Sequence, residues 1–196
     1  MIRHDKIALS LTAIAGMISI YLGLFQSQMG IVWFPALLLI LGLQLNTYVN
    51  RKYDYDDDID QREGGRIIYA TMMAVVAISV TSLVMNIPFY KRTADIIGLS
   101  LFDAKLYAGL MAVAEEQFFR GFLTNFAYRY GLKNTATASV ASALIGTVYH
   151  FMRYGEDPSA LMFVFLGFVI LSFISLREQR LSPAILAHLI HNVVYA

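Results

Sequence analysis

Long apolar segments separated by short polar links make up most of this chain. Seven of them follow one another, at residues 7–25, 31–49, 67–90, 106–130, 135–154, 159–176 and 182–196. A helix that crosses a bilayer needs about 20 predominantly apolar residues. Hydrophobic residues form 58% of the 196-residue chain and charged residues only 15%, which is more apolar than a soluble domain of this length. The sequence therefore predicts an all-α, polytopic membrane helix bundle of about seven helices.

Charge and cysteine content exclude several classes of function. The net charge is +1, so no basic surface is available for nucleic acid. The chain has no cysteine, which excludes disulfides, thiolate zinc sites and cysteine catalysis. The apolar run after the basic start, Met1 to Lys6, is too long for a signal-peptide core, and no small-x-small cleavage site follows it. We interpret it as a retained first span.

One polar loop, residues 50–66, divides the chain. Its acidic run from Asp54 to Asp60 invites a calcium interpretation, but the EF-hand pattern needs glycine at its sixth position and glutamate at its twelfth. Counted from Asp54, these positions hold Ile59 and Gly65, which favours a solvated loop. We expect residues 1–105 to form N-terminal membrane helices with this loop. Residues 106–196 would form the catalytic helices of the same structural domain.

Lysine and arginine in the links predict the orientation of the chain. With seven crossings and a cytoplasmic N-terminus, ten of these residues lie on the inner side and four on the outer side. Cytoplasmic loops carry the excess of positive charge. The sequence thus predicts an integral protein of the plasma (cell) membrane with its N-terminus in the cytoplasm.

Ionisable residues inside the apolar segments occur only in the C-terminal half. An acidic or basic side chain at the centre of a membrane helix costs roughly 2.5–3.5 kcal/mol on insertion scales. The first three segments carry none. The later segments carry Glu115, Glu116, Arg120, His150, His188 and His191. Their concentration on three helices favours one shared polar cavity.

Spacing assigns partners within this set. Glu116 and Arg120 are four residues apart, so they share a helix face and can pair. Glu115 is rotated by about 100° from Glu116 and has no opposite charge three or four residues away, which makes it a candidate general base. His188 and Asn192 are also four residues apart and face the same way.

Each of these residues taken alone also has a structural interpretation. Glu116 and Arg120 can be a purely structural ion pair, and His150 can be an interfacial histidine near its helix end. His191 and Asn192 can hydrogen-bond between packed membrane helices.

The combination favours chemistry. A glutamate and a histidine can hold and deprotonate a water molecule, while a second histidine and an asparagine amide can donate to an oxyanion. That set describes a hydrolase without a serine, threonine or cysteine nucleophile. Alternatively, Glu115, His150 and His188 could bind a divalent metal such as zinc that activates water. The H-E-x-x-H signature is absent, because the two C-terminal histidines are only three residues apart.

Three motifs resemble those of the CPBP (Abi) family, which includes the type II CAAX prenyl proteases and bacteriocin-processing enzymes. Residues 115–121 read E-E-Q-F-F-R-G and match the family's E-E-x-x-F-R-G in full. The F-x-x-x-H motif keeps its histidine at His150 but has Gly146 in place of phenylalanine. The H-x-x-x-N motif falls on His188 and Asn192, after Pro183. The resemblance covers approximately residues 106–196.

The resemblance implies an intramembrane endopeptidase. Its substrate would be a peptide or protein, in the CAAX type cleaved near a prenylated C-terminus. By position, Glu115 with His150 would activate water and Glu116 with Arg120 would hold the geometry. His188 and Asn192 would form the oxyanion site, and His191 matches no family position. The resemblance favours metal-free hydrolysis, with zinc as the other possibility.

Two other classes of function stay open at this stage. One is a non-enzymatic bacteriocin-immunity or chaperone-like member of the same family. The other is a proton-coupled transporter with Glu115, His150 and His188 as a relay, although the sequence has no internal repeat. The segment boundaries place Glu115 near mid-membrane and the two histidines near opposite faces, so a joint site is expected to need a tilted or offset helix.

Overall fold

The computed structural model describes residues 38–43, 45, 63–85, 101–154 and 157–195. These residues form helices and short turns, with no strand among them, which agrees with the predicted all-α class. Six helical bodies are counted in this part of the chain, so the predicted number of about seven is not confirmed. The expected first span, residues 7–25, and residues 50–62 of the polar loop lie outside the described residues. The last four residues of that predicted loop, 63–66, are helical.

Five long helical bodies make up most of the described part of the bundle. They are α3 (Glu63–Met85), the rod that begins with α5 (Leu101–Glu115), α7 (Thr135–Tyr154), α8 (Pro158–Glu178) and α9 (Ser182–Tyr195). The rod continues through a π-helix η1 (Glu116–Thr124), a short α6 (Asn125–Ala127) and a second π-helix η2 (Tyr128–Leu132). Helical dihedral angles at each junction make it one continuous helix. The sixth body is the short helical stretch at residues 38–43 and 45.

Local sequence explains where α8 begins and ends. The Asp157 carboxylate accepts hydrogen bonds from the backbone N–H groups of Ser159 and Ala160, each at 3.1 Å, and Pro158 occupies the first turn. Both features are typical of helix N-termini. At the other end, Gln179 adopts a left-handed conformation with φ of 53°, which terminates the helix. The short link to α9 therefore follows from cap chemistry.

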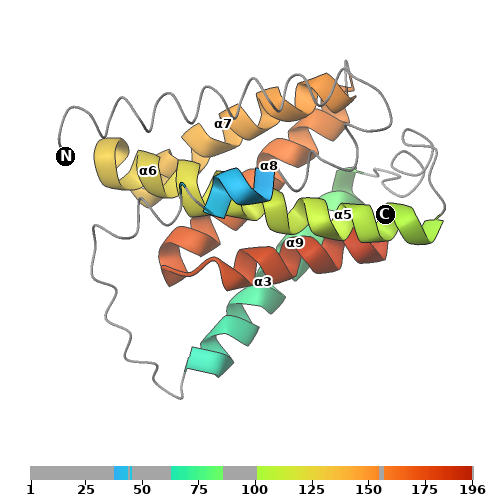
Figure 1. Ribbon diagram of the computed structural model, residues 1–196, viewed down its shortest axis with the longest axis horizontal. Coiled ribbons are helices and arrows are strands. Elements are labelled where there is room, and N and C mark those ends of the chain that lie inside the picture. The colour runs from blue at the N-terminus through green and yellow to red at the C-terminus, as the bar shows by residue number, and fades with distance from the viewer. Residues whose placement is uncertain (1–37, 44, 46–62, 86–100, 155–156, 196) are drawn as a thin grey trace.

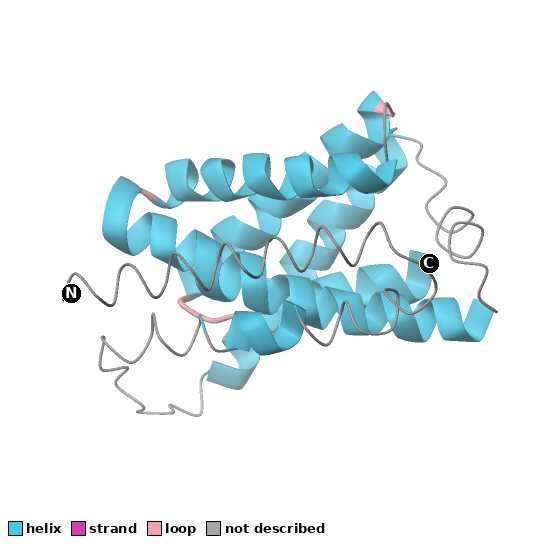
Figure 2. Ribbon diagram, turned by 45° about the horizontal axis from the view of Figure 1, so that its top comes forward, coloured by secondary structure: helices cyan, strands magenta, loops and turns pink. Residues whose placement is uncertain are grey.

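The helices of the C-terminal half pack around the segment that carries Glu115, Glu116 and Arg120. Helix α7 packs along α8, while α9 packs against both α3 and α5 (Figure 1). Figure 2 shows the same bundle with its connecting turns confined to the ends of the helices. The rod of α5 and η1 also contacts α7 and α8, so it lies between the α7–α8 pair and α9. This arrangement places the rod of α5 and η1 against three other helices, α7, α8 and α9.

Within the described residues, two helices are long and apolar enough to cross a membrane, α3 over Gly65–Met85 and α8 over Pro158–Glu178. Only 28% and 44% of their most apolar stretches are buried inside the protein. Large apolar side chains on α3 therefore face outward; Leu83 and Val84 are 81% and 77% exposed. An apolar surface of this kind suits lipid and is costly in water.

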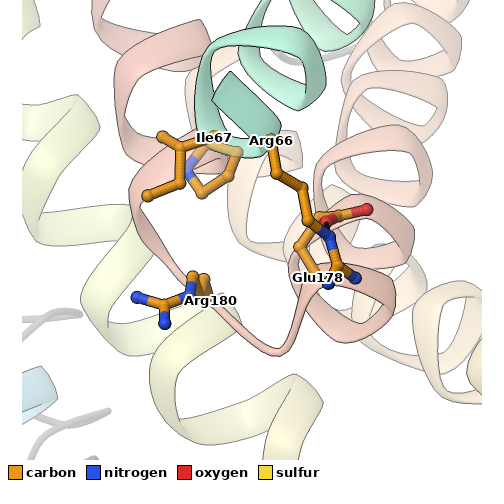
Figure 3. Close-up of a pocket in the computed structure, with 5 residues that line it drawn as sticks. Arg66, Ile67, Glu178 and Arg180 are labelled. Carbon is orange, nitrogen blue, oxygen red and sulfur yellow. Dashed lines mark hydrogen bonds and ion pairs between the residues drawn. The ribbon is translucent and has the colours of Figure 1, made fainter. Parts of the chain in front are cut away.

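An ion pair joins the beginning of α3 to the end of α8. Nε of Arg66, at the start of α3, lies 2.5 Å from Oε2 of Glu178, at the end of α8. Figure 3 shows this contact beside a small pocket, with Arg180 on the other side of the turn. The beginning of α3 and the end of α8 therefore lie at the same level of the bundle.

Candidate active site

The first motif lies at the junction between an α-helix and a π-helix. Glu115 is the last residue of α5 and Glu116 is the first of η1. Hydrogen bonds in π-helices join residues five apart. Such segments are rare in proteins as a whole, but those that occur are often at functional sites. The sequence predicted an ordinary α-helix here, because the residues of the motif do not indicate a change to a π-helix. Helix type therefore has to be read from the structure.

Side-chain hydrogen bonds support the π-helix. The Thr124 hydroxyl donates to the carbonyl of Phe119 at 2.8 Å, five residues earlier. It also lies 2.7 Å from the hydroxyl of Ser142 on α7 and 3.3 Å from that of Ser172 on α8. All three hydroxyl residues are buried. This cluster ties the end of η1 to both neighbouring helices.

Glu116 is the centre of a buried charge cluster. Its Oε1 lies 2.8 Å from Nη1 of Arg120, and both side chains are fully buried. The same oxygen lies 2.7 Å from Nδ1 of His188 on α9. The contact between Glu116 and Arg120 was predicted from their spacing. The contact with His188 was not, because it joins residues far apart in the sequence.

Glu115 lies between two imidazole rings. Its Oε1 is 3.8 Å from Nε2 of His150, and its Oε2 is 3.9 Å from Nε2 of His188. Both distances exceed a direct hydrogen bond and are of the length at which a bridging water is expected. A water about 2.8 Å from each partner fits beside the line that joins such atoms. The predicted grouping of Glu115, His150 and His188 is thus found, despite their different positions along their helices.

The hydrogen bond at Nδ1 of each histidine determines which ring nitrogen carries the hydrogen. Nδ1 of His150 lies 2.8 Å from the Gly146 carbonyl, which can only accept, so Nδ1 donates. Nδ1 of His188 likewise donates to the Glu116 carboxylate. In the neutral form of each ring, Nε2 is therefore unprotonated. Both Nε2 atoms face Glu115.

The observed contacts of Asn192 and His191 are with residues outside this cluster. The Asn192 amide donates to the Ala108 carbonyl on α5 at 3.0 Å, so its observed hydrogen bond joins α9 to α5. The buried ring of His191 faces Phe163 of α8 at a centroid distance of 5.5 Å. His191 was excluded from the predicted core set, and its ring lies against α8.

Metal binding by Glu115, His150 and His188 was the other possibility. These side chains are of types that bind zinc. Among the described residues, however, no group of three His, Cys, Asp or Glu side chains has an arrangement that could hold a metal ion. The present geometry does not fit a metal, and we derive no step through one.

Comparison with known proteins identifies a matching family. A family model described as type II CAAX prenyl endopeptidase Rce1-like matches residues 97–194. The matched range contains all six predicted site residues. Searches of curated proteins and of solved structures found no match.

Proposed function

The chain belongs to the type II CAAX prenyl endopeptidase family, and from this premise we propose that it is a membrane endopeptidase in which Glu115 and His150 activate a water molecule. Its substrate is a peptide or protein, cleaved near a prenylated C-terminus. The observation that carries the proposal is the Glu115 carboxylate between two imidazole Nε2 atoms, at 3.8 and 3.9 Å.

The first step is attack by water on the scissile carbonyl. The water donates one hydrogen bond to Glu115 and the other to the unprotonated Nε2 of His150. As the water oxygen bonds to the carbonyl carbon, Glu115 takes its proton and a tetrahedral oxyanion forms. The C–N bond then breaks and Glu115 returns the proton to the leaving amine. The products are a carboxylic acid and an amine, and Glu115 is again ionised.

The two histidines have different partners, which suits them to different roles. Nδ1 of His150 donates to a neutral carbonyl, whereas Nδ1 of His188 donates to the carboxylate of Glu116. A carboxylate stabilises an imidazolium. We therefore assign His188 as the protonated ring, whose Nε2–H donates to the oxyanion. His150 stays neutral and accepts from water.

Asn192 completes the proposed oxyanion site. Its amide nitrogen carries two hydrogens, of which one binds the Ala108 carbonyl. The second hydrogen would donate to the oxyanion, which is the role that the family resemblance implies for Asn192. The bond to Ala108 holds α9 against α5 and thereby also positions His188.

Charge balance supports this protonation state. Glu115 and Glu116 contribute two negative charges, while Arg120 and a protonated His188 contribute two positive charges. A cluster with no net charge is far less costly to bury than one with an unpaired charge. The proposed resting state therefore suits a site inside the membrane.

The lysine and arginine distribution supports the proposed placement of the enzyme. We propose that the protein resides in the plasma (cell) membrane with a cytoplasmic N-terminus. Its partners are then the bilayer and the peptide or protein substrate.

Cleavage of a prenylated C-terminal peptide by the purified protein in detergent tests the proposal. We expect Glu115→Gln to lower the rate by about 10²–10⁴-fold, because the general base is lost. His191→Gln is the matched control, since it alters a buried residue of α9 outside the cluster, and it should keep the wild-type rate. An unprenylated copy of the peptide tests the need for the prenyl group.

Two results would overturn the proposal. One is a Glu115→Gln variant that cleaves as fast as the wild type. The other is a failure of the wild type to cleave either peptide, which would favour a non-enzymatic role for this member of the family.

A further inference from the structure

We infer that Phe168 of α8 is a positioning residue for the active site, and that Gly146 keeps open the space for its ring. This inference rests on the proposed function for the meaning of "active site". Helix α8 contributes no ionisable residue to the cluster. Its Phe168 side chain contacts Arg120 and His150 of the cluster.

The ring of Phe168 contacts two residues of the site, Arg120 and His150. Cζ of Arg120 is 3.9 Å from the ring centroid. The His150 ring meets it nearly perpendicularly, with centroids 5.4 Å apart and an interplanar angle of 75°. One buried ring therefore contacts the guanidinium that pairs with Glu116 and the imidazole that faces Glu115.

Arg120 depends strongly on this contact. Its side chain is fully buried. Within the described part of the chain, none of its nitrogens has a partner that meets hydrogen-bond geometry, although Nη1 is paired with Glu116. The face of an aromatic ring attracts a cation, and more strongly where water is excluded. The Phe168 ring thus supplies the second stabilising contact that fixes the guanidinium.

Gly146 is the residue that admits the ring. A methyl group placed on Gly146 would lie 2.0 Å from Cε1 of Phe168, whereas carbon atoms in contact are about 3.5–4.0 Å apart. No larger residue fits at position 146 while the ring stays in place. The Gly146 carbonyl also accepts from Nδ1 of His150. Gly146 therefore both orients His150 and leaves room for its aromatic neighbour.

This contact explains the departure from the family motif seen in the sequence. Gly146 replaces the phenylalanine of the F-x-x-x-H motif. In the structure, a phenylalanine from the facing helix fills the space beside Gly146. His150 thus has an aromatic contact from α8 in addition to that of Tyr149 on its own helix.

Two pairs of variants test the inference. Phe168→Met removes the ring but keeps an apolar side chain, and Phe163→Met is its control, because Phe163 is equally buried on α8 but contacts His191. Gly146→Ala displaces the ring, and Gly167→Ala is its control, because a methyl group there meets nothing within 4 Å. Phe168→Tyr keeps an aromatic face.

We expect Phe168→Met and Gly146→Ala each to lower kcat by about 10–100-fold with little change in KM, because misplaced catalytic groups slow the chemical step. Phe168→Tyr and both controls should stay within about threefold of the wild type, since the aromatic face or the site itself is intact. In the Phe168→Met background, Gly146→Ala should cost little further, since the ring is already gone.

A second measurement does not depend on activity. Nitrogen NMR of ¹⁵N-histidine-labelled protein in detergent reports which ring nitrogen of His150 carries hydrogen. We expect one fixed tautomer in the wild type and a mixture in Phe168→Met. If the wild type cleaves no peptide, the proposed function fails and this measurement alone decides the positioning role.

The inference is overturned if Phe168→Met keeps both the wild-type kcat and the fixed tautomer. It is also overturned if Phe163→Met lowers kcat as much as Phe168→Met does. That result would show a general effect of lost packing in α8.

Discussion

Replacing Glu116 by glutamine should destabilise the protein far more than a single lost ion pair at its surface. Glutamine keeps an oxygen at Oε1 that can still accept from His188, so the shape of the site and this hydrogen bond persist. What disappears is the negative charge beside Arg120. Both side chains are fully buried, so water cannot take the place of the lost carboxylate. The Glu116→Gln variant therefore measures the energetic cost of removing the carboxylate that pairs with the buried guanidinium at 2.8 Å.

The expected magnitude follows from burial. Breaking a buried ion pair by removing one partner costs about 3–5 kcal/mol, against a total stability of roughly 5–15 kcal/mol. Arg120→Met should cost less than Glu116→Gln, because His188 can still neutralise the remaining carboxylate at 2.7 Å. The double variant has no charge left at either position. It should be more stable than Glu116→Gln alone.

Arg66 and Glu178 provide a matched control at the surface. Their side chains are paired at 2.5 Å, but that of Arg66 is 66% exposed. Exposed pairs contribute only about 0.2–1 kcal/mol, so Glu178→Gln should have a small effect. Unfolding of each variant in mixed detergent and SDS micelles, followed by circular dichroism, gives the differences in free energy.

The reasoning fails if Glu116→Gln costs no more than Glu178→Gln. It also fails if the double variant loses the sum of the two single losses, because additivity would mean that the two charges do not interact.

Three further predictions concern the hydroxyl cluster, the helix contact and the metal. Thr124→Val should cost about 1–3 kcal/mol in the same unfolding assay, since the Phe119 carbonyl and the Ser142 hydroxyl lose a buried partner; Thr124→Ser should restore most of it, and an unaffected valine variant would contradict the argument. Asn192→Ala should lower kcat and cost roughly 0.5–1.5 kcal/mol, because the hydrogen bond to Ala108 is lost; wild-type kcat and stability would refute this. Excess chelator should leave peptide cleavage unchanged if no metal takes part, and loss of cleavage restored by zinc would show that one does.

The helices of the C-terminal half could be predicted from the sequence because their signals are local. The apolar segments of spanning length predicted most of the residues that these helices contain. Asp157 with Pro158, and Ser182 with Pro183, mark where α8 and α9 begin. The contact of Glu116 with Arg120 followed from their spacing, which places them on one face in either helix type.

The missing parts of the site depend on contacts between distant segments. The letters around Glu116 do not show that the helix widens there, nor that His188 shares its carboxylate. Nothing in the sequence of α8 singles out Phe168 from the other phenylalanines of that helix. The catalytic roles of Glu115 and His150 remain predictions, since proximity does not establish activity.

The π-helix changes how this site should respond to deletions. Each of its hydrogen-bonded rings encloses one residue more than a ring of an α-helix, so loss of one residue between Gly121 and Thr124 would let the segment rewind as an α-helix. The rewinding takes up the missing residue, so Glu115 and Glu116 on one side and Thr124 on the other keep their relative rotation. The same deletion in an ordinary α-helix rotates one side against the other by about 100°. A single-codon deletion that spares every motif residue should therefore be tolerated better in η1 than in α7.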